Sequence, residues 1–331
     1  MEKLFDNTET AFALKTDTEL DRAYFLFKMI ANEPLVRIGT AVTNFAIKAH
    51  LPVEGLIRAT VFDHFCGGVN EQDCLPVVDK MFTKGVASVL DYSVEGKEDE
   101  DQFDAALAMT LRTIDFAIAR EAIPFAVFKP TGFGRFELYE KLGRKESLTP
   151  DEQAEWNRVI ERFDRVCSAA HQGNVMLLID GEESWMQDAA DDLVEQMMRK
   201  YNKEKAVVFN TLQLYRHDRV PYLKELHERA KADGFHIGMK LVRGAYMEKE
   251  NKRAEELGYP TPICKDKAAT DANFDAAVHY MMEHLEHMAI FAGTHNESSS
   301  YRLMQLMDEH GIAKNDTRVY FGQLYGMSDN I

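Results

Sequence analysis

The feature that most constrains the fold is a regular alternation of short apolar runs and longer amphipathic segments, which begins near residue 85. Seven apolar runs, each short enough for one strand, lie at 86–93, 123–131, 174–183, 205–215, 235–246, 288–297 and 317–327. The segments between them carry apolar residues at helical spacing and are long enough to cross back over a sheet. Short strands that alternate with helices in this way predict a parallel sheet with right-handed crossovers.

The alternation does not fix the order of the strands, so a doubly wound sheet and a (βα)8 TIM-type barrel both stay open. The barrel is favoured for two reasons. No Gly-x-Gly-x-x-Gly follows the first run, and polar residues cluster at the ends of many runs rather than at one switch point. The first 84 residues instead carry four segments with apolar residues at helical spacing. We therefore predict an N-terminal helical region at 1–84 and a barrel at 85–331.

Composition and charge exclude several classes of protein. The net charge of −16 disfavours a nucleic-acid binder, and no apolar run approaches the length that spans a bilayer. The four cysteines lie far apart without Cys-x-x-Cys spacing, which predicts reduced thiols in a cytoplasmic protein and no metal site. The sequence contains no Gly-x-Ser-x-Gly, His-Glu-x-x-His or P-loop motif, so a hydrolase or a kinase is disfavoured.

Polar residues follow the predicted strands at the point where each one ends. They are Asp91, Lys129, Asp180, Gln213, Lys240, Arg243, Thr294, His295 and Gln323. Any one of them alone is more simply explained as a helix cap or a surface group, but the pattern repeats at seven strand ends. In a barrel these ends face one mouth. The cations Lys129, Lys240 and Arg243 indicate an anionic substrate or cofactor phosphate, and Gly244 allows a close approach of the backbone to a ligand.

Four segments carry a resemblance to a known family: MKLVRGAYMEKE (239–250), GYPTPICKDKAATDANF (258–274), FAGTHNE (291–297) and VYFGQLYGM (319–327). From about residue 85 onward the chain resembles proline dehydrogenase, the flavin-dependent enzyme that oxidises L-proline to Δ1-pyrroline-5-carboxylate in the first step of proline catabolism. The resemblance implies FAD across the carboxyl ends of the strands and hydride transfer from proline C5 to flavin N5. It also implies a membrane quinone as electron acceptor, and hence peripheral contact with the inner face of a membrane.

The resemblance further implies roles for individual residues. Lys129 matches a lysine that contacts the substrate carboxylate, and Leu324 matches an apolar contact to the proline ring. Asp180 and Lys240 are the predicted catalytic residues. Lys240 stands where many bacterial members have arginine near flavin N5, and lysine is a point donor without the planar fork. The predicted cofactor-binding residues are Gly181, Gln213, Lys240, Val242, Arg243, Gly244, Ala245, Tyr246, Thr270, Thr294, His295, Asn296 and Gln323.

Glu95 matches a substrate-site carboxylate that pairs with an arginine on a last helix in the family. Family members continue past the seventh strand into an eighth strand and that helix, which bears an arginine pair for the substrate carboxylate. We therefore expect this chain to lack its final portion, so that the barrel is distorted and incomplete. Two alternatives stay open: a hydroxyproline dehydrogenase, and a catalytically impaired flavin-binding relative.

Overall fold

The computed structural model describes residues 4–49, 55, 58–92 and 98–331. The described chain divides into two compact units. One contains the residues up to Val86 together with Gln323–Ile331, and the other contains Ala87–Gly322. The division into domains at 1–84 and 85–331 stays a prediction.

The first unit is helical. Its elements are η1 (Leu4–Asp6), α1 (Thr8–Ala11), α2 (Asp17–Ile30), α3 (Glu33–Lys48), a π-helical segment η2 (Arg58–Phe62), α5 (Asp63–Phe65) and α6 (Glu71–Phe82). A capping box begins α2, where the Thr16 side chain accepts from the Glu19 amide and Glu19 accepts from the Thr16 amide. The terminal residues join this unit: the Nε2 atom of the buried His64 lies 3.0 Å from the Gly326 carbonyl oxygen.

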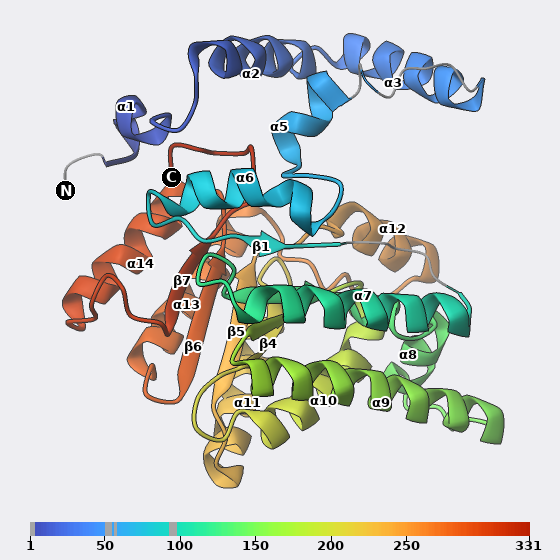
Figure 1. Cartoon of the computed structure of the whole chain (residues 1–331). Coiled ribbons are helices and arrows are strands. Elements are labelled where there is room, and N and C mark those ends of the chain that lie inside the picture. Colours follow the sequence, from blue (N-terminus) through green and yellow to red (C-terminus); the bar gives the residue numbers. More distant parts are fainter. Residues whose placement is uncertain (1–3, 50–54, 56–57, 93–97) are drawn as a thin grey trace. The chain divides into compact units, whose positions relative to one another are not determined.

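The second unit is built on one parallel sheet (Figure 1). Its strands are β1 (Val89–Leu90), β2 (Phe125–Phe128), β3 (Met176–Ile179), β4 (Val208–Gln213), β5 (Ile237–Val242), β6 (Met288–Gly293) and β7 (Val319–Gly322). All seven fall inside the predicted runs. They lie in sequential order from β1 to β7, and every neighbouring pair is parallel. A sequential order has no switch point, so the doubly wound alternative was wrong and the TIM-like arrangement is confirmed.

The sheet is strongly curled. The ring of Phe125 in β2 lies 5.1 Å from that of Phe291 in β6 and 4.7 Å from that of Tyr320 in β7. In a flat sheet, strands four or five places apart lie roughly 20 Å from each other. These rings therefore meet inside the curl, where they form a core with Val127, Leu178, Phe209 and Ala289.

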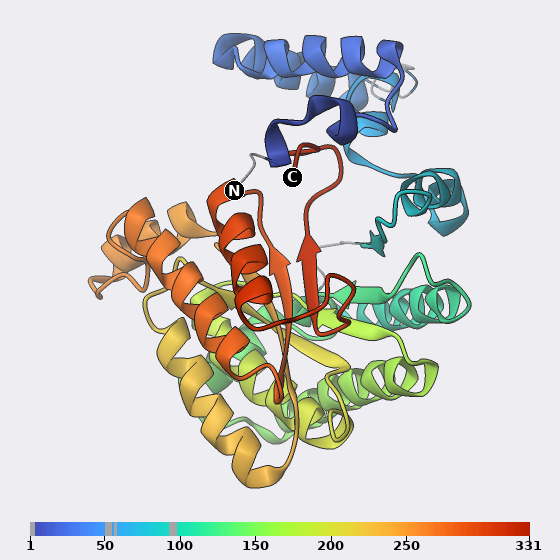
Figure 2. The same cartoon turned by 90° about the vertical axis from the view of Figure 1, so that its left-hand side faces the viewer.

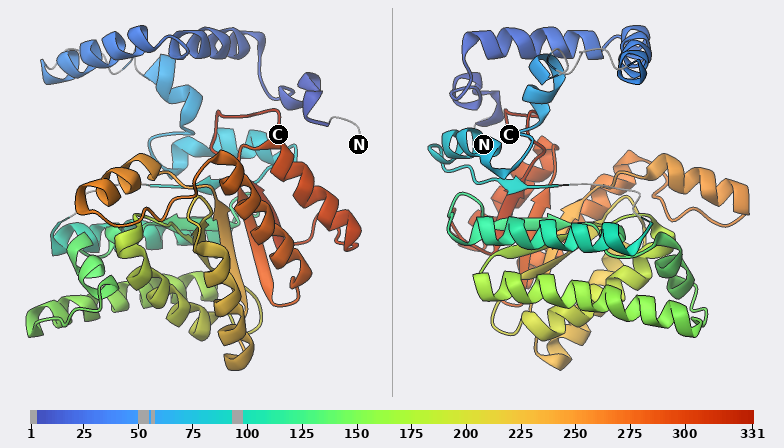
Figure 3. Two further views of the ribbon diagram at one scale, coloured as in Figure 1. Left: turned by 180° about the vertical axis from the view of Figure 1, so that it is seen from behind. Right: turned by 45° about the vertical axis from the view of Figure 1, so that its right-hand side comes forward.

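Helices cover the outer face of the sheet (Figures 2 and 3). They are α7 (Glu100–Ile118), α8 (Phe136–Gly143), α9 (Pro150–Gly173), α10 (Ser184–Tyr201), α11 (Arg219–Asp233), α12 (Met247–Leu257), α13 (Lys267–Glu283) and α14 (Glu297–Glu309), with the short η3 (Pro130–Gly132) after β2. Several begin at side-chain caps: Asp99 for α7, Asp266 for α13 and Asn296 for α14. Because both faces of the sheet are covered, β2 and β4 are buried along their whole length. None of the described helices is both long and apolar enough to cross a bilayer.

Candidate active site

Polar side chains from β2 to β6 gather at one edge of the second unit. Parallel strands place their carboxyl ends together, and β3, β4, β5 and β6 are neighbours in the sheet. At or next to these ends lie five residues that the sequence predicted: Asp180, Gln213, Lys240, Arg243 and Thr294. Within the described part of the chain, no three histidine, cysteine or acidic side chains are arranged to hold a metal ion.

The two predicted catalytic residues form an ion pair. Lys240 Nζ donates to Asp180 Oδ1 at 2.6 Å, and the two side chains are 19% and 17% exposed. Because β4 lies between β3 and β5, this pair reaches across one strand at the carboxyl edge. The ammonium is thereby held in one place by its partner, although its role in a reaction stays a prediction.

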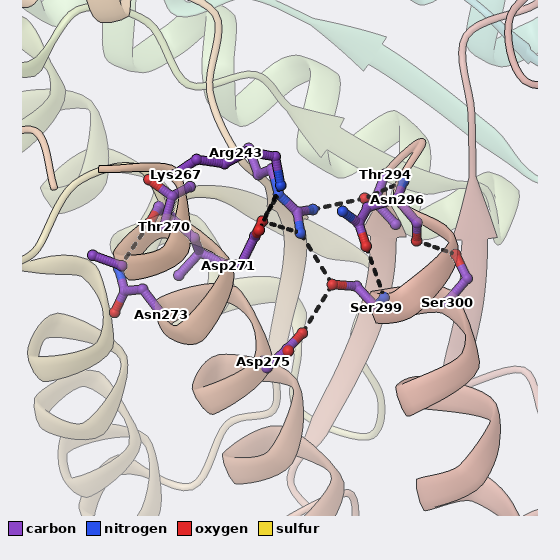
Figure 4. A network of polar contacts seen from close by, with 12 residues as sticks. Arg243, Lys267, Thr270, Asp271, Asn273, Asp275, Thr294, Asn296, Ser299 and Ser300 are labelled. Carbon is purple, nitrogen blue, oxygen red and sulfur yellow. Dashed lines mark hydrogen bonds and ion pairs between the residues drawn. The ribbon is translucent and has the colours of Figure 1, made fainter. Parts of the chain in front are cut away.

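Arg243 is the centre of a polar network that joins four elements (Figure 4). Its Nε donates to Asp271 Oδ1 at 2.8 Å, its Nη1 to Thr294 Oγ1 at 2.9 Å and its Nη2 to Ser299 Oγ at 3.1 Å. The guanidinium also lies over the Phe274 ring, 4.6 Å from its centroid. The network therefore fixes the end of β5 against α13, β6 and α14.

The charges of this network are matched. Burial raises the pKa of the Asp271 carboxyl, but hydrogen bonds from Lys267 and Arg243 outweigh burial and hold the pKa below its ordinary value. Asp271 is thus ionised beside the guanidinium near neutral pH. Sequence reasoning missed Asp271 and Ser299, although Asp271 directly follows the predicted Thr270.

The backbone after β5 comes close to an aromatic ring. Gly244 has φ +122°, and a Cβ atom placed on it would lie 2.6 Å from Tyr215 Cζ. A side chain here would meet the ring and strain the backbone, so glycine is required. Gly244 and Ala245 are exposed, and Tyr246 directly precedes α12.

Gln213 covers the glycine at the end of β3. Gln213 is 2% exposed, and a Cβ atom on Gly181 would lie 3.1 Å from Gln213 Cδ. On its other side, Gln213 pairs in register with Val242. The structure thus brings these three predicted residues together.

The segment after β6 is ordered by its own side chains. Thr294 Oγ1 accepts from the Asn296 amide at 3.1 Å, and Asn296 Oδ1 accepts from the Ser299 amide at 3.0 Å, which caps α14. Burial lowers the pKa of His295 and favours the neutral imidazole. Thr270 is buried in α13, where its hydroxyl donates to the Asp266 carbonyl oxygen at 3.3 Å.

Lys129 directly follows β2 and directly precedes η3. It lines a pocket with Asp91 and Tyr92 after β1 and with residues of α7. Nearby, at the end of β3, stands Glu182, a 4%-exposed carboxyl that sequence reasoning missed. Burial raises the pKa of Glu182 to about 7, although hydrogen bonds from Thr131 and the charge of Lys129 oppose the rise. An acidic residue two positions beyond a predicted strand-end aspartate was the available signal.

Three predicted residues lie outside the described part of the second unit. Gln323 and Leu324 follow β7, belong to the first compact unit and are exposed. Glu95 lies outside the described residues. The roles predicted for these three residues stay predictions.

A curled parallel sheet with charged and amide side chains at its carboxyl edge defines an α/β protein of the TIM-like class. The sequence model of a family described as Proline dehydrogenase matches residues 74–331. The chain belongs to the proline dehydrogenase family.

The chain is also similar to individual proteins. The carbapenem antibiotics biosynthesis protein CarD of Pectobacterium carotovorum subsp. carotovorum is 34% identical over 307 residues, which cover 92% of this chain and 79% of CarD. Human mitochondrial proline dehydrogenase 1 is 38% identical over 187 residues, which cover 56% of this chain and 31% of the human protein.

The fold has a counterpart among solved structures. Proline utilization A (PutA) from Bdellovibrio bacteriovorus, inactivated by N-propargylglycine, superposes with a TM-score of 0.70 and 19% identity. The match covers 83% of this chain and 30% of the PutA chain, so this chain spans less than a third of that protein and of the human enzyme.

Proposed function

We propose that this chain is an FAD-dependent oxidoreductase that converts L-proline to Δ1-pyrroline-5-carboxylate. The observation that carries the proposal is the gathering of Lys129, Asp180, Lys240 and Arg243 at one edge of the sheet in a member of the proline dehydrogenase family. Cations at this edge suit a ligand with carboxylate and phosphate groups.

The donor set at the ends of β4, β5 and β6 fits a flavin. Gln213, Lys240 and Thr294 are donors on three adjacent strands, and His295 follows Thr294 as a neutral imidazole because burial lowers its pKa. Gly244 is exposed and has no side chain, so its backbone is open to a flat or phosphorylated ligand. Val242, Arg243, Ala245, Tyr246, Thr270, Asn296, Gly181 and Gln323 complete the proposed cofactor-binding set.

When bound, FAD supplies the two-electron acceptor that the side chains themselves cannot provide. Oxidation of proline between its nitrogen and C5 requires loss of a hydride from C5 and of a proton from the amine. The protein's part is to hold the substrate in place and to exclude water from it.

Two lysines, Lys129 and Lys240, are proposed to hold the reactants in place. Lys129 binds the substrate carboxylate, because a charge-assisted hydrogen bond fixes an anion more firmly than a neutral one. Asp180 holds Lys240 at 2.6 Å, so the ammonium faces the reacting region from a fixed position. Leu324 and Glu95 are proposed to contribute to the substrate site as well.

The electron acceptor is proposed to be a quinone, which lies in a membrane. Contact with the membrane would then be peripheral, at its inner face, by a protein of the cytoplasm. This part of the proposal depends on the family and not on any residue described above.

The test is spectroscopic. The purified protein, supplied with FAD, is expected to be yellow and to lose its absorbance near 450 nm when L-proline is added without oxygen. Bleaching by hydroxyproline but not by proline would instead favour a hydroxyproline dehydrogenase. A yellow protein that neither amino acid bleaches would favour a catalytically impaired flavin-binding relative. A folded protein that takes up no FAD would contradict the proposal.

A second setting for the same reaction is favoured by the likeness to CarD, which is named for carbapenem antibiotic biosynthesis. Oxidation of a proline-type ring would then serve a biosynthetic sequence rather than catabolism. Steady-state rates measured side by side for free proline and for proline derivatives substituted on the ring would distinguish the two: a preference for a derivative would favour biosynthesis.

A further inference from the structure

The buried carboxyl of Glu182 has no part in the function proposed above, yet it lies beside the residues that do. It follows β3 by three positions and is 4% exposed. Asp180, two positions earlier, pairs with Lys240 of β5, whereas Glu182 binds the segment after β2. The end of β3 therefore contacts Lys240 through one carboxylate and the segment that follows Lys129 through another.

Glu182 holds the turn after β2 with both of its oxygens. The Thr131 amide donates to Oε2 at 3.0 Å, and the Thr131 hydroxyl donates to Oε1 at 2.6 Å. Thr131 is two positions after Lys129, in the one-turn helix η3 that Lys129 precedes. A displacement of Thr131 would therefore move the backbone that carries Lys129.

The same turn is fixed at two other points. The hydroxyl of the fully buried Tyr139 donates to the Pro130 carbonyl oxygen at 2.8 Å. The Gly132 amide donates to the Lys129 carbonyl oxygen at 2.9 Å. With these contacts in place, and with the Asp180 amide donating to the Phe128 carbonyl oxygen at 3.0 Å, Glu182 adds a side-chain restraint from the end of β3.

Glu182 is itself firmly anchored. Its amide donates to Gln187 Oε1 at 2.9 Å, and Gln187 Nε2 donates to Asp191 Oδ1 at 2.8 Å. Asp191 also accepts from Asn210 Nδ2 at 2.9 Å and from Arg219 Nη1 at 2.6 Å. This buried network extends over α10, β4 and α11, so the carboxylate is held by rigid elements and not by a loop alone.

We propose that Glu182 is a positioning residue, which fixes the turn after β2 through Thr131 and thereby sets the place from which Lys129 binds the substrate carboxylate. The inference rests on the proposed function, because it gives Lys129 the substrate. Glu182 itself does not touch the substrate.

The electrostatics agree with the geometry. Burial and the neighbouring charge of Glu183 raise the pKa of Glu182 to about 7, while the bonds from Thr131 and the charge of Lys129 lower it. The ionised carboxylate has two acceptor oxygens for the two Thr131 donors. In the protonated carboxyl group, one oxygen instead carries a proton. The restraint is therefore complete above pH 7 and weakens as the pH falls through that value.

The first experiment is kinetic. In Glu182→Gln, one acceptor oxygen becomes an N–H donor that faces the Thr131 donors. At pH 8 the KM for L-proline is expected to rise about tenfold, as the loss of one charge-assisted hydrogen bond predicts, while kcat stays within about twofold and FAD content is unchanged. Thr131→Val, which keeps the amide but loses the hydroxyl, should raise KM in the same direction, and Thr131→Ser should restore it.

The matched control is Glu183→Gln. Glu183 is the adjacent carboxylate, is also buried, and is bound by Lys249 rather than by Thr131. Its KM at pH 8 is expected to stay near that of the unaltered protein. If both glutamine variants raise KM equally, the effect belongs to the local charge and the positioning role is wrong.

The second experiment does not depend on catalysis. In protein labelled with 15N-threonine, the Thr131 amide resonance should shift with a midpoint near pH 7, because its acceptor changes charge. The shift should be absent in Glu182→Gln. If the Thr131 resonance does not titrate, or if it titrates while KM is unaffected by Glu182→Gln and Thr131→Val, the inference is wrong.

The two proposals fail in different ways. If proline does not bleach the flavin of the unaltered protein, the proposed function fails, and with it the substrate part of this inference. If proline does bleach it and Glu182→Gln keeps the KM of the unaltered protein, only the positioning role of Glu182 fails.

Discussion

The two edges of the seven-stranded sheet differ in the polar groups that the described structure places there. At the carboxyl edge the groups are charged: Asp180 with Lys240, Arg243 with Asp271, and Glu182 with Thr131. At the amino edge the most deeply buried polar groups include the neutral side chains of Asn202 and His227. Removing charges from water costs free energy, so a buried ion pair seldom improves stability. A satisfied neutral hydrogen bond has a smaller desolvation cost and makes a net contribution to stability. In other barrels the carboxyl edge carries the binding residues and the amino edge contributes to stability, and the proposed function assigns the two edges of this sheet in the same way.

Asn202 shows how the amino edge is held together. Its Nδ2 donates to the carbonyl oxygens of Val208 at 2.8 Å and His236 at 3.0 Å. Its Oδ1 accepts from the amides of Val207 at 2.9 Å and Val208 at 2.8 Å. One side chain therefore joins the end of α10 to the starts of β4 and β5.

A group of histidines lies near the same edge, between α11 and α13 and at the starts of β5 and β6. His227 Nδ1 lies 2.8 Å from the Tyr280 hydroxyl, and its ring lies 4.7 Å from that of His284 and 5.8 Å from that of His287. The ring centroids of His236 and His287 lie 6.3 Å apart. Burial and neighbouring imidazoles lower the pKa of His227 and of His236.

The largest expected effect tests whether the carboxyl edge binds the cofactor. Gly244→Val is expected to abolish FAD retention while far-ultraviolet circular dichroism stays near normal, because its side chain would meet the Tyr215 ring and occupy the approach to the ligand. Gly258→Val is the control, since Gly258 also has a positive φ but no described atom would lie within 4 Å of a Cβ placed on it. Stoichiometric FAD in Gly244→Val would mean that this turn does not hold the cofactor.

The next effect tests the amino edge. Asn202→Ala leaves four buried backbone groups without their partner and is expected to lower the free energy of unfolding by about 3 kcal/mol. FAD bound per folded molecule and the KM for proline should not change. Denaturant unfolding measures the loss, with Asn157→Ala on the exposed face of α9 as the control. A rise in KM as large as the one in Lys129→Ala would remove the distinction between the edges.

Lys129→Ala tests the carboxyl edge by a smaller change. Loss of a charge-assisted hydrogen bond of roughly 1.5–3 kcal/mol should raise the KM for proline roughly 10- to 100-fold and leave FAD content unaltered. Lys141→Ala, which removes a lysine paired with Glu152 on α8 and α9, is the control. Steady-state kinetics decide the matter: an unchanged KM would make Lys129 a surface charge only.

The smallest effect is the pH dependence of the amino edge. Burial, followed by the charges of His284, Lys231 and His287, lowers the pKa of His227, while Glu228 opposes them. Burial and His287 lower the pKa of His236. Since folding favours the neutral imidazoles, their stabilisation is present above the ordinary histidine pKa of 6.5 and is lost as the pH falls below it.

Thermal unfolding between pH 8 and 5.5 measures this loss. The decrease in Tm on acidification should be shallower in His227→Leu than in the unaltered protein, and unchanged in His310→Leu, which lies outside the histidine group. An equal decrease in all three proteins would show that acid acts elsewhere.

The sequence alone determined much of the second unit. All seven strands were predicted, because short apolar runs between amphipathic segments depend on the local period of the backbone. The proximity of Asp180, Gln213, Lys240 and Thr294 followed too, since parallel strands place their carboxyl ends at one edge whatever their order. The four quoted segments identified the family, which the comparisons confirmed.

Only the tertiary structure decided the order of the strands and the partners of the side chains. The curl of the sheet, which brings Phe125 to Phe291, excluded the doubly wound arrangement. Arg243 binds Ser299, 56 positions away, and Glu182 binds Thr131, 51 positions away. Spacing along the chain does not predict such pairs, because they depend on how each crossover helix packs on the sheet and on how strongly the sheet curls. Local periodicity therefore fixed which residues reach the carboxyl edge, and three-dimensional packing decided which of them bind one another.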